Sequence, residues 1–132
     1  MGFSWIRKIK FDENGLIPAV IQDARSKQVL MVAYMNREAV QKTLKTGAAH
    51  FYSRSRKKIW LKGETSGHIQ RVKGIALDCD QDTLLVQVAQ TGGACHTGYR
   101  SCFFRVSRDG KVWKTRDKKI FDPSKVYGKS AS

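Results

Sequence analysis

Residues 77–104 contain most of the side chains in this chain that are suited to binding metal ions. All three cysteines lie there, together with three closely spaced aspartates (Cys79, Cys95, Cys102; Asp78, Asp80, Asp82). Thiolates are typical ligands of zinc, whereas carboxylates favour hard cations such as Mg²⁺ or Ca²⁺. The residue types therefore predict two metal sites of different chemistry.

The aspartates occupy alternate positions, with Cys79 and Gln81 between them. In an extended segment this spacing puts the three carboxylates on one face and Cys79 on the other. In a chain of net charge +14 the cluster is self-repelling, and a bound divalent cation would relieve that repulsion. The alternative is a solvated acidic strand end or turn. A calcium-binding EF-hand loop is excluded because glycine does not follow Asp82.

The cysteines lack the CxxC spacing of zinc ribbons and of redox-active thiol proteins, and a lone buried cysteine is commonly just a small apolar residue. The histidine next to Cys95 and the surrounding glycines (Gly92, Gly93, Gly98) make metal ligation the stronger interpretation. Three thiolates leave a coordination position open for water, as in catalytic zinc sites, whereas His96 as fourth ligand would close the site. Spacing leaves this choice open.

A basic segment upstream contains side chains suited to phosphate groups and to stacking on a base. They are Arg54, Arg56, Lys58, Trp60 and Lys62, followed in a small-residue loop by Glu64 and Ser66. His68 ends this loop and is available for proton transfer. The alternative readings are an exposed basic hairpin tip and a structural histidine.

Hydrophobic patterning predicts the elements that position these groups. A ten-residue helix is expected at residues 37–46, because Asn36 is a good N-cap and Gly47 a good C-cap. Strands are expected at residues 16–17, 19–21, 29–35, 49–53, 59–61, 68–73, 75–82, 83–89 and 103–106. The predicted fold class is α+β, dominated by antiparallel or mixed β-sheet with one or two short helices.

A chain of 132 residues is expected to form one domain. We divide it into a basic N-terminal arm (residues 1–10), a main domain (11–106) and a basic C-terminal tail (107–132). The net charge is +8 in residues 1–104 and +6 in residues 105–132, which favours anionic partners without choosing among them. No apolar run reaches the roughly 18 residues of a membrane span, and the N-terminus is too charged for a secretory signal. We therefore expect a cytoplasmic protein without membrane contact.

Three blocks of sequence occur together in a recognisable order. WLKGETSGHIQRVKGIALDCDQDTLLVQV and GGACHTGYRSCFFR, preceded by VLMVAYMNREAVQKTLKTGAAHFYSRSRKKIW, closely resemble the phosphoribosyl-AMP cyclohydrolase family. The resemblance covers roughly residues 11–105. It implies an enzyme of histidine biosynthesis that opens the adenine ring of phosphoribosyl-AMP between N1 and C6.

The same resemblance implies roles for the metal-binding side chains. Cys79, Cys95 and Cys102 would bind one zinc per subunit, and the three aspartates would bind Mg²⁺. It also implies an intertwined homodimer whose zinc site takes cysteines from both chains. Two features depart from the family pattern as we place it: Gln81 stands where some members have glycine, and we place no counterpart for the tail after Arg105. That tail is too short for the pyrophosphohydrolase domain fused to some members, so a monofunctional enzyme is expected.

The expected mechanism is attack of zinc-activated water on C6, followed by cleavage of the N1–C6 bond. His96 is the first choice and His68 the second for moving the proton, while the basic hairpin and Mg²⁺ hold the two substrate phosphates. The competing class is a zinc-stabilised nucleic-acid-binding module with a closed Cys₃His site. The charge of +14 favours it, but three adjacent acids would repel phosphate unless metal occupied them.

Overall fold

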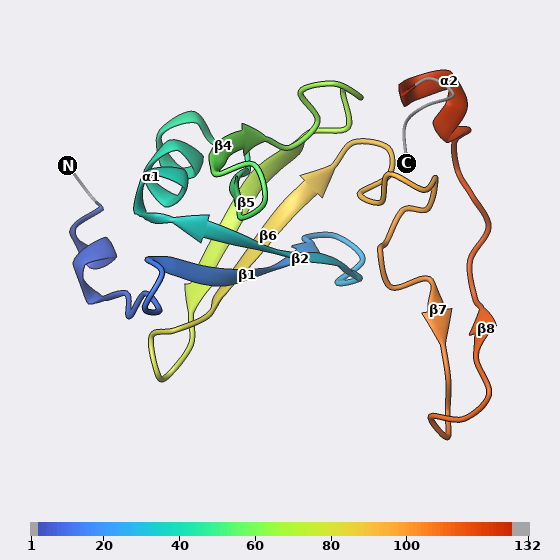
Figure 1. The fold of residues 1–132 in the computed structure, drawn as a ribbon, viewed down its shortest axis with the longest axis horizontal. Coiled ribbons are helices and arrows are strands. Elements are labelled where there is room, and N and C mark those ends of the chain that lie inside the picture. Colours follow the sequence, from blue (N-terminus) through green and yellow to red (C-terminus); the bar gives the residue numbers. More distant parts are fainter. Residues whose placement is uncertain (1–2, 128–132) are drawn as a thin grey trace.

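A four-stranded mixed sheet forms the centre of the computed structural model, which describes residues 3–127 (Figure 1). β1 (Leu16–Asp23) pairs antiparallel with β2 (Val29–Asn36) and parallel with β6 (Leu84–Gln90). β5 (Gln70–Leu77) adds to the other edge of β6 in antiparallel orientation. The predicted α+β class with a mixed sheet and few helices is confirmed.

The predicted helix is confirmed at both ends as α1 (Arg37–Thr46). The Asn36 side chain accepts a hydrogen bond from the Ala39 N–H at 2.8 Å, and Gly47 ends the helix in the left-handed conformation with φ 76°. Both caps satisfy backbone groups that a helix end leaves without partners. Among residues 3–127 no helix has the length and apolarity needed to cross a bilayer.

The predicted basic hairpin is also present, as β3 (His50–Ser53) and β4 (Lys58–Leu61). Phe51 and Trp60 pair across its two strands with ring centroids 5.2 Å apart. Phe51 is completely buried, which anchors the hairpin on the core. The charged tip between the strands is exposed to solvent.

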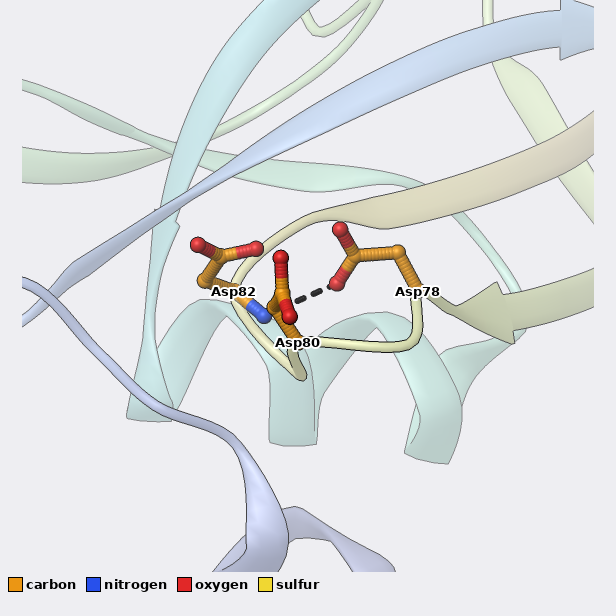
Figure 2. Close-up of side chains that lie close together, drawn as sticks. All are labelled: Asp78, Asp80 and Asp82. Atoms are coloured by element: carbon orange, nitrogen blue, oxygen red, sulfur yellow. Dashed lines mark hydrogen bonds between the residues drawn. The ribbon is translucent and has the colours of Figure 1, made fainter.

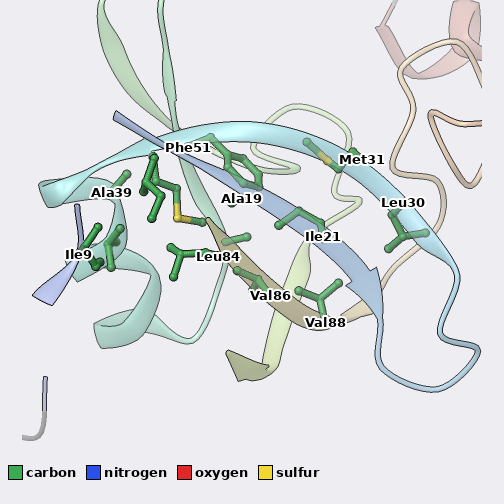
Figure 3. Packing of buried hydrophobic residues seen from close by; sticks show 14 of the residues in the cluster. Ile9, Ala19, Ile21, Leu30, Met31, Ala39, Phe51, Leu84, Val86 and Val88 are labelled. Carbon is green, nitrogen blue, oxygen red and sulfur yellow. The ribbon is translucent and has the colours of Figure 1, made fainter. Parts of the chain in front are cut away.

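One hydrophobic core lies between the sheet, α1 and the β3–β4 hairpin (Figure 3). Alternate residues of β1 and β6 are buried in it, among them Ile21, Leu84 and Val86. Each such side chain contributes about 1.5–3 kcal/mol by leaving water. Ile6 of the 3₁₀ helix η1 (Ser4–Lys8) and the following Ile9 join the same cluster. Part of the predicted N-terminal arm is therefore packed on the domain.

The strand predicted at residues 75–82 is wrong at its C-terminal end. β5 is a single strand from Gln70 to Leu77, with a register shift near Gly74, and it ends before the first aspartate. Residues 78–82 form a turn instead. Its backbone is held by the Gln81 N–H donating to the Asp78 carbonyl at 3.0 Å, with Gln81 at φ 64°. A left-handed residue cannot continue a strand, so the turn ends β5.

The C-terminal segment runs away from the sheet and then returns to the loop that follows β6. β7 (Arg105–Val106) and β8 (Lys114–Thr115) form a two-stranded arm that projects from the body of the molecule (Figure 1). The chain then runs back to the short helix α2 (Pro123–Tyr127), beside the loop that follows β6. The domain limits at residues 10 and 106 stay predictions, but the tail is not detached from the core.

Candidate active site and metal-binding groups

The three aspartates converge in the turn between β5 and β6 (Figure 2). One carboxylate oxygen from each lies within 4.8 Å of the others, and all three side chains are exposed. Asp78 Oδ1 accepts hydrogen bonds from the backbone N–H groups of Asp82 at 3.0 Å and Thr83 at 3.2 Å. The convergence expected from the spacing is therefore present, although it arises from a folded turn and not from one face of a strand.

The electrostatics of this turn favour a bound cation. The pKa of Asp82 is raised by reduced hydration of its carboxyl, by a hydrogen bond with Asp78 and by the charges of Asp78 and Asp80. A divalent cation would remove that mutual repulsion, and a set of exposed carboxylate oxygens fits a hard ion such as Mg²⁺. The donor set is thus compatible with the metal that the sequence predicted.

Within one chain, the three cysteines do not come together. Cys79 lies in the acidic turn before β6, whereas Cys95 and Cys102 lie in the loop after it. The seven residues of β6 separate the two ends by about 20 Å at the usual rise of a strand. Among the described residues, the aspartates are the sole group of three or more candidate ligands close enough to share an ion.

Cys95 and Cys102 face a common environment at the far end of β6. Cys102 is an exposed residue, but partial desolvation of its sulfur, and next the neighbouring Cys95 thiol, raise the pKa of the Cys102 thiol to about 12. Cys95 is buried, with its sulfur 2.8 Å from the Thr97 hydroxyl. Two neighbouring thiols form a suitable pair for zinc, whose charge stabilises thiolates.

Lys62 lies beside this thiol pair and is not free to extend into solvent. Its side chain is buried, with 8% of the residue exposed, and its Nζ donates to the Ala94 carbonyl at 2.6 Å. Burial lowers the pKa of Lys62, and the neighbouring Cys102 and Cys95 oppose that effect. The residue predicted to bind phosphate therefore holds the backbone next to Cys95.

A pocket of about 340 Å³ opens above β4 and the loop after it. Six of the nine residues predicted for catalysis or substrate binding line it: Arg56, Trp60, Lys62, Glu64, Ser66 and His96. The remaining lining comes from Leu61, Gly63, Thr65 and Tyr127. Sequence reasoning missed Tyr127, which lies 61 residues beyond Ser66 in a segment without a motif.

The other three predicted residues lie outside the pocket lining. The Arg54 guanidinium lies over the Tyr34 ring at 4.2 Å, and Lys58 is exposed where β4 begins. The His68 ring is packed edge-on against Phe121, with centroids 4.6 Å apart, and its buried Nδ1 has no hydrogen-bond partner. Of the two candidate histidines, His96 alone faces the pocket.

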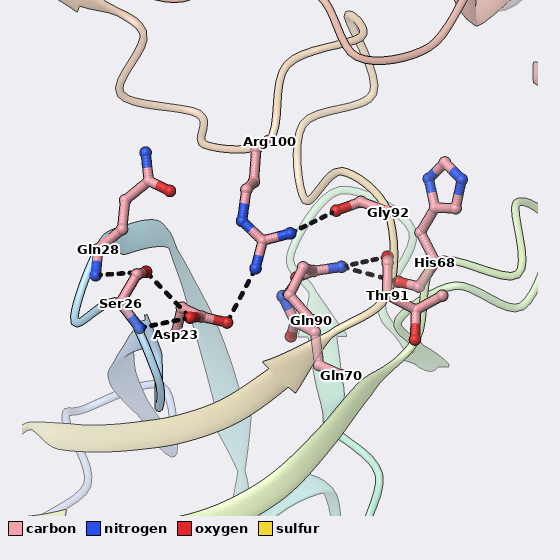
Figure 4. Close-up of polar contacts among 9 residues, drawn as sticks. All are labelled: Asp23, Ser26, Gln28, His68, Gln70, Gln90, Thr91, Gly92 and Arg100. Atoms are coloured by element: carbon pink, nitrogen blue, oxygen red, sulfur yellow. Dashed lines mark hydrogen bonds and ion pairs between the residues drawn. The ribbon is translucent and has the colours of Figure 1, made fainter.

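The side-chain amides of Gln70 and Gln90 support the loop that carries Cys95 and His96 (Figure 4). Gln90 Nε2 donates to the carbonyls of Thr91 at 2.8 Å and His68 at 3.3 Å. Gln70 Nε2 in turn donates to Gln90 Oε1 at 2.9 Å. Because Gln90 Nε2 donates to both carbonyls, Gln90 Oε1 is the atom left to accept from Gln70 Nε2. The network connects the ends of β5 and β6 to the start of the loop.

An ion pair ties the same loop to the turn between β1 and β2 (Figure 4). Arg100 Nη2 contacts Asp23 Oδ1 at 2.9 Å, and Arg100 Nη1 donates to the Gly92 carbonyl at 3.2 Å. Asp23 is buried, which by itself raises its pKa, but hydrogen bonds from Ser26 and the charge of Arg100 outweigh burial and lower it. No local motif signals this pair, because its members lie 77 residues apart.

The family model for phosphoribosyl-AMP cyclohydrolase matches residues 31–104, which include the predicted zinc and Mg²⁺ ligands. The phosphoribosyl-AMP cyclohydrolase of Methanoregula boonei is 60% identical over 122 residues, 92% of this chain and 96% of that protein. Its counterpart in Methanosarcina acetivorans is 61% identical over 115 residues (87% and 92%), and that of Neisseria meningitidis serogroup C is 55% identical over 124 (93% and 94%). On this similarity, the chain belongs to the phosphoribosyl-AMP cyclohydrolase family.

Proposed function

We propose that this protein hydrolyses the N1–C6 bond of the adenine ring in phosphoribosyl-AMP, a step of histidine biosynthesis. The observation that carries the proposal is the pocket in which His96 lies with Trp60 and Arg56, directly beside the Cys95–Cys102 thiol pair. Membership of the family supplies the reaction. The pocket and the thiol pair contain groups suited to each step of this reaction.

Zinc is proposed to be shared between two subunits of an intertwined homodimer. Cys95 and Cys102 provide two thiolates, but Cys79 of the same chain lies at the other end of β6. Cys79 of the partner subunit is therefore the proposed third ligand, and the site is incomplete without it. When bound, zinc lowers the pKa of water toward about 7 and so provides a nucleophile at neutral pH.

The pocket residues bind the substrate and move its proton. Trp60 and Arg56 both line the pocket, and we assign Trp60 to contact with the purine and Arg56 to a phosphate group. Water adds at C6, the N1–C6 bond breaks, and the nitrogen that leaves gains a proton. His96, adjacent to Cys95, is the group in the pocket that can carry this proton.

Mg²⁺ is proposed to bind Asp78, Asp80 and Asp82, because their carboxylates converge and repel one another without a cation. The three cysteines are free thiols in the described structure, which fits a reducing compartment such as the cytoplasm.

The test is to add phosphoribosyl-AMP to the purified protein with Zn²⁺ and Mg²⁺ and to follow the ultraviolet spectrum as the purine ring opens. His96→Ala should lower turnover while retaining about one zinc per chain, measured by metal analysis. His50→Ala is the matched control, since His50 lies outside the pocket with its Nδ1 against the Ala48 carbonyl. A wild-type protein that leaves the spectrum unchanged would refute the activity. Loss of zinc from the His96 variant would show that His96 is a ligand.

A further inference from the structure

The C-terminal segment contacts the loop that carries Cys95 and His96 through its backbone. The N–H of Ile120 donates to the Gly98 carbonyl at 2.8 Å, and the N–H of Phe121 approaches the same oxygen at 3.4 Å. Residues 118–127 lie outside the stretch that the family model matches. The family model therefore says nothing about this contact, and the structure alone describes it.

Phe121 approaches the loop closely at two glycines, with its ring at Gly93 and its backbone carbonyl at Gly98. A Cβ on Gly93 would lie 2.7 Å from Phe121 Cε1, and a Cβ on Gly98 would lie 2.8 Å from the Phe121 carbonyl oxygen. The ring also packs edge-on against His68. Both distances are too short for any real side chain, so the loop and Phe121 fit each other closely.

The residues after Phe121 bring a second aromatic ring to the pocket. Asp122 Oδ1 accepts hydrogen bonds from the backbone N–H of Ser124 at 3.0 Å and from its hydroxyl at 2.7 Å, at the start of α2, which begins at Pro123. Tyr127 ends this helix, with its ring centroid 6.4 Å from that of Phe121. Tyr127 lines the same pocket as Trp60 and His96.

We propose that Tyr127 is a substrate-contacting residue that provides an aromatic wall for the purine, and that Phe121 is a positioning residue that holds Tyr127 and the His96 loop in place. The proposal rests on the proposed function and adds a substrate-binding element to it from the C-terminal segment. Aromatic rings bind nucleobases through their faces, whatever the polar substituents of the base. Such a contact corresponds to about fivefold or more in binding.

The first experiment compares Tyr127→Ala, Tyr127→Phe and the control Trp113→Ala. Trp113 is also a tail aromatic, but it is 63% exposed and lies outside the pocket. Tyr127→Ala should raise KM for phosphoribosyl-AMP about fivefold or more, with kcat changed less than about twofold and an unchanged melting temperature. Tyr127→Phe should match wild type because it keeps the ring. Equal kinetics for Tyr127→Ala and Trp113→Ala, or equal defects in the Ala and Phe variants of Tyr127, would overturn the proposal.

AMP alone separates this proposal from the proposed function, because its binding needs no turnover. Calorimetric titration should show weaker AMP binding by Tyr127→Ala than by Trp113→Ala, in protein whose zinc content is unchanged. If wild type binds AMP and fails to open the ring of phosphoribosyl-AMP, the activity is refuted while the aromatic wall stands. If AMP binds both variants equally, the wall is refuted whatever the activity.

Phe121 is tested by a readout other than activity. Phe121→Leu keeps an apolar side chain and the fold, whereas Phe121→Ala empties the space beside Gly93. Amide hydrogen exchange in residues 93–98 should be faster in the Ala variant than in the Leu variant, and KM should rise in the same order. Exchange in this loop that equals wild type in both variants would overturn the positioning role.

Discussion

The two ends of β6 carry the two predicted metal-binding regions, and they are built in different ways. At the start of the strand, the acidic turn is exposed and is formed by neighbours in sequence. At its end, the thiol loop is packed and is held by residues from distant parts of the chain: Gln70 through Gln90, Asp23 through Arg100, and Lys62 through the Ala94 carbonyl. The first region is a local structure for which we propose a bound ion, whereas the second is a tertiary structure for which we propose a ligand from a partner subunit.

The largest expected effect tests whether these two ends meet between subunits. Cys79→Ala and Cys102→Ala homodimers should each be inactive. A mixed dimer places both lesions in one shared site and leaves the other site native. Refolding an equal mixture should make about half of the dimers mixed, so activity should return to about a quarter of wild type.

The control for this experiment is a mixture of Cys95→Ala with Cys102→Ala. Both of these cysteines belong to the same end of β6, so every site in that mixed dimer lacks one thiolate and no activity should return. Recovery in neither mixture, after subunit exchange has been verified by mass spectrometry of tagged chains, would show that the sites are not shared in this way.

The second prediction concerns the acidic end alone. Asp80→Asn removes one of three converging carboxylates, so the dependence of activity on Mg²⁺ should shift to higher concentration while zinc content is unchanged. Asp109→Asn is the matched control, since it removes an equally exposed acid in the β7–β8 arm. Identical Mg²⁺ titrations for the two variants would argue against a carboxylate metal site.

The difference between the two ends also explains which features the sequence could predict. The bounds of α1 and the convergence of the aspartates depend on residues within a few positions of one another, and both were found. The backbone of the acidic turn was not found, because Gln81 gives no sign of a left-handed conformation. The Asp23–Arg100 pair and the place of Tyr127 depend on contacts between distant segments, for which a single sequence contains no signal.

Lys62 is another residue whose contact could not be predicted from the sequence. Its residue type and its basic neighbours predicted a phosphate contact, yet its amine donates to the Ala94 carbonyl inside the protein. The local residue types did indicate the right part of the molecule, since Lys62 also lines the pocket. The direction of the side chain was decided by packing between β4 and the thiol loop.

The third prediction concerns the contacts of Arg100 that hold the thiol loop at the end of β6. Arg100→Leu leaves the buried Asp23 carboxylate without its cation and removes the bond to the Gly92 carbonyl. Because Arg100 is itself partly exposed, we expect a loss of about 1–2 kcal/mol in the free energy of unfolding, measured by urea denaturation. Arg116→Leu breaks an exposed pair with Asp117 and should cost less than about 1 kcal/mol. Equal losses would mean that the Asp23 pair contributes no more than a surface contact.

The fourth prediction follows from the lowered pKa of Asp23. A carboxyl whose pKa is lower in the folded state binds its proton more weakly there, so its stabilisation is present above the unfolded pKa of about 3.9 and is lost as pH falls through the folded value. Wild type should therefore lose stability below about pH 4 more steeply than Asp23→Asn. Urea denaturation at pH 3 to 7 measures this, and parallel curves would contradict it.

The smallest expected effect concerns the acidic turn. It tests whether the shape of this turn depends on the Gln81 side chain or on the backbone alone. Gln81 has φ 64°, which glycine adopts without strain, and its backbone makes the turn through the bond from its N–H to the Asp78 carbonyl. Gln81→Gly relieves that strain but loosens the unfolded chain, so we expect a gain between zero and about 1 kcal/mol in the free energy of unfolding. Gln28→Gly, in the β1–β2 turn at an ordinary φ, should instead cost about 0.5–1 kcal/mol.

Mg²⁺ titrations of both variants should match wild type, because neither substitution touches a carboxylate. A weakened Mg²⁺ response in Gln81→Gly would show that the Gln81 side chain, and not the backbone turn alone, holds the aspartates together.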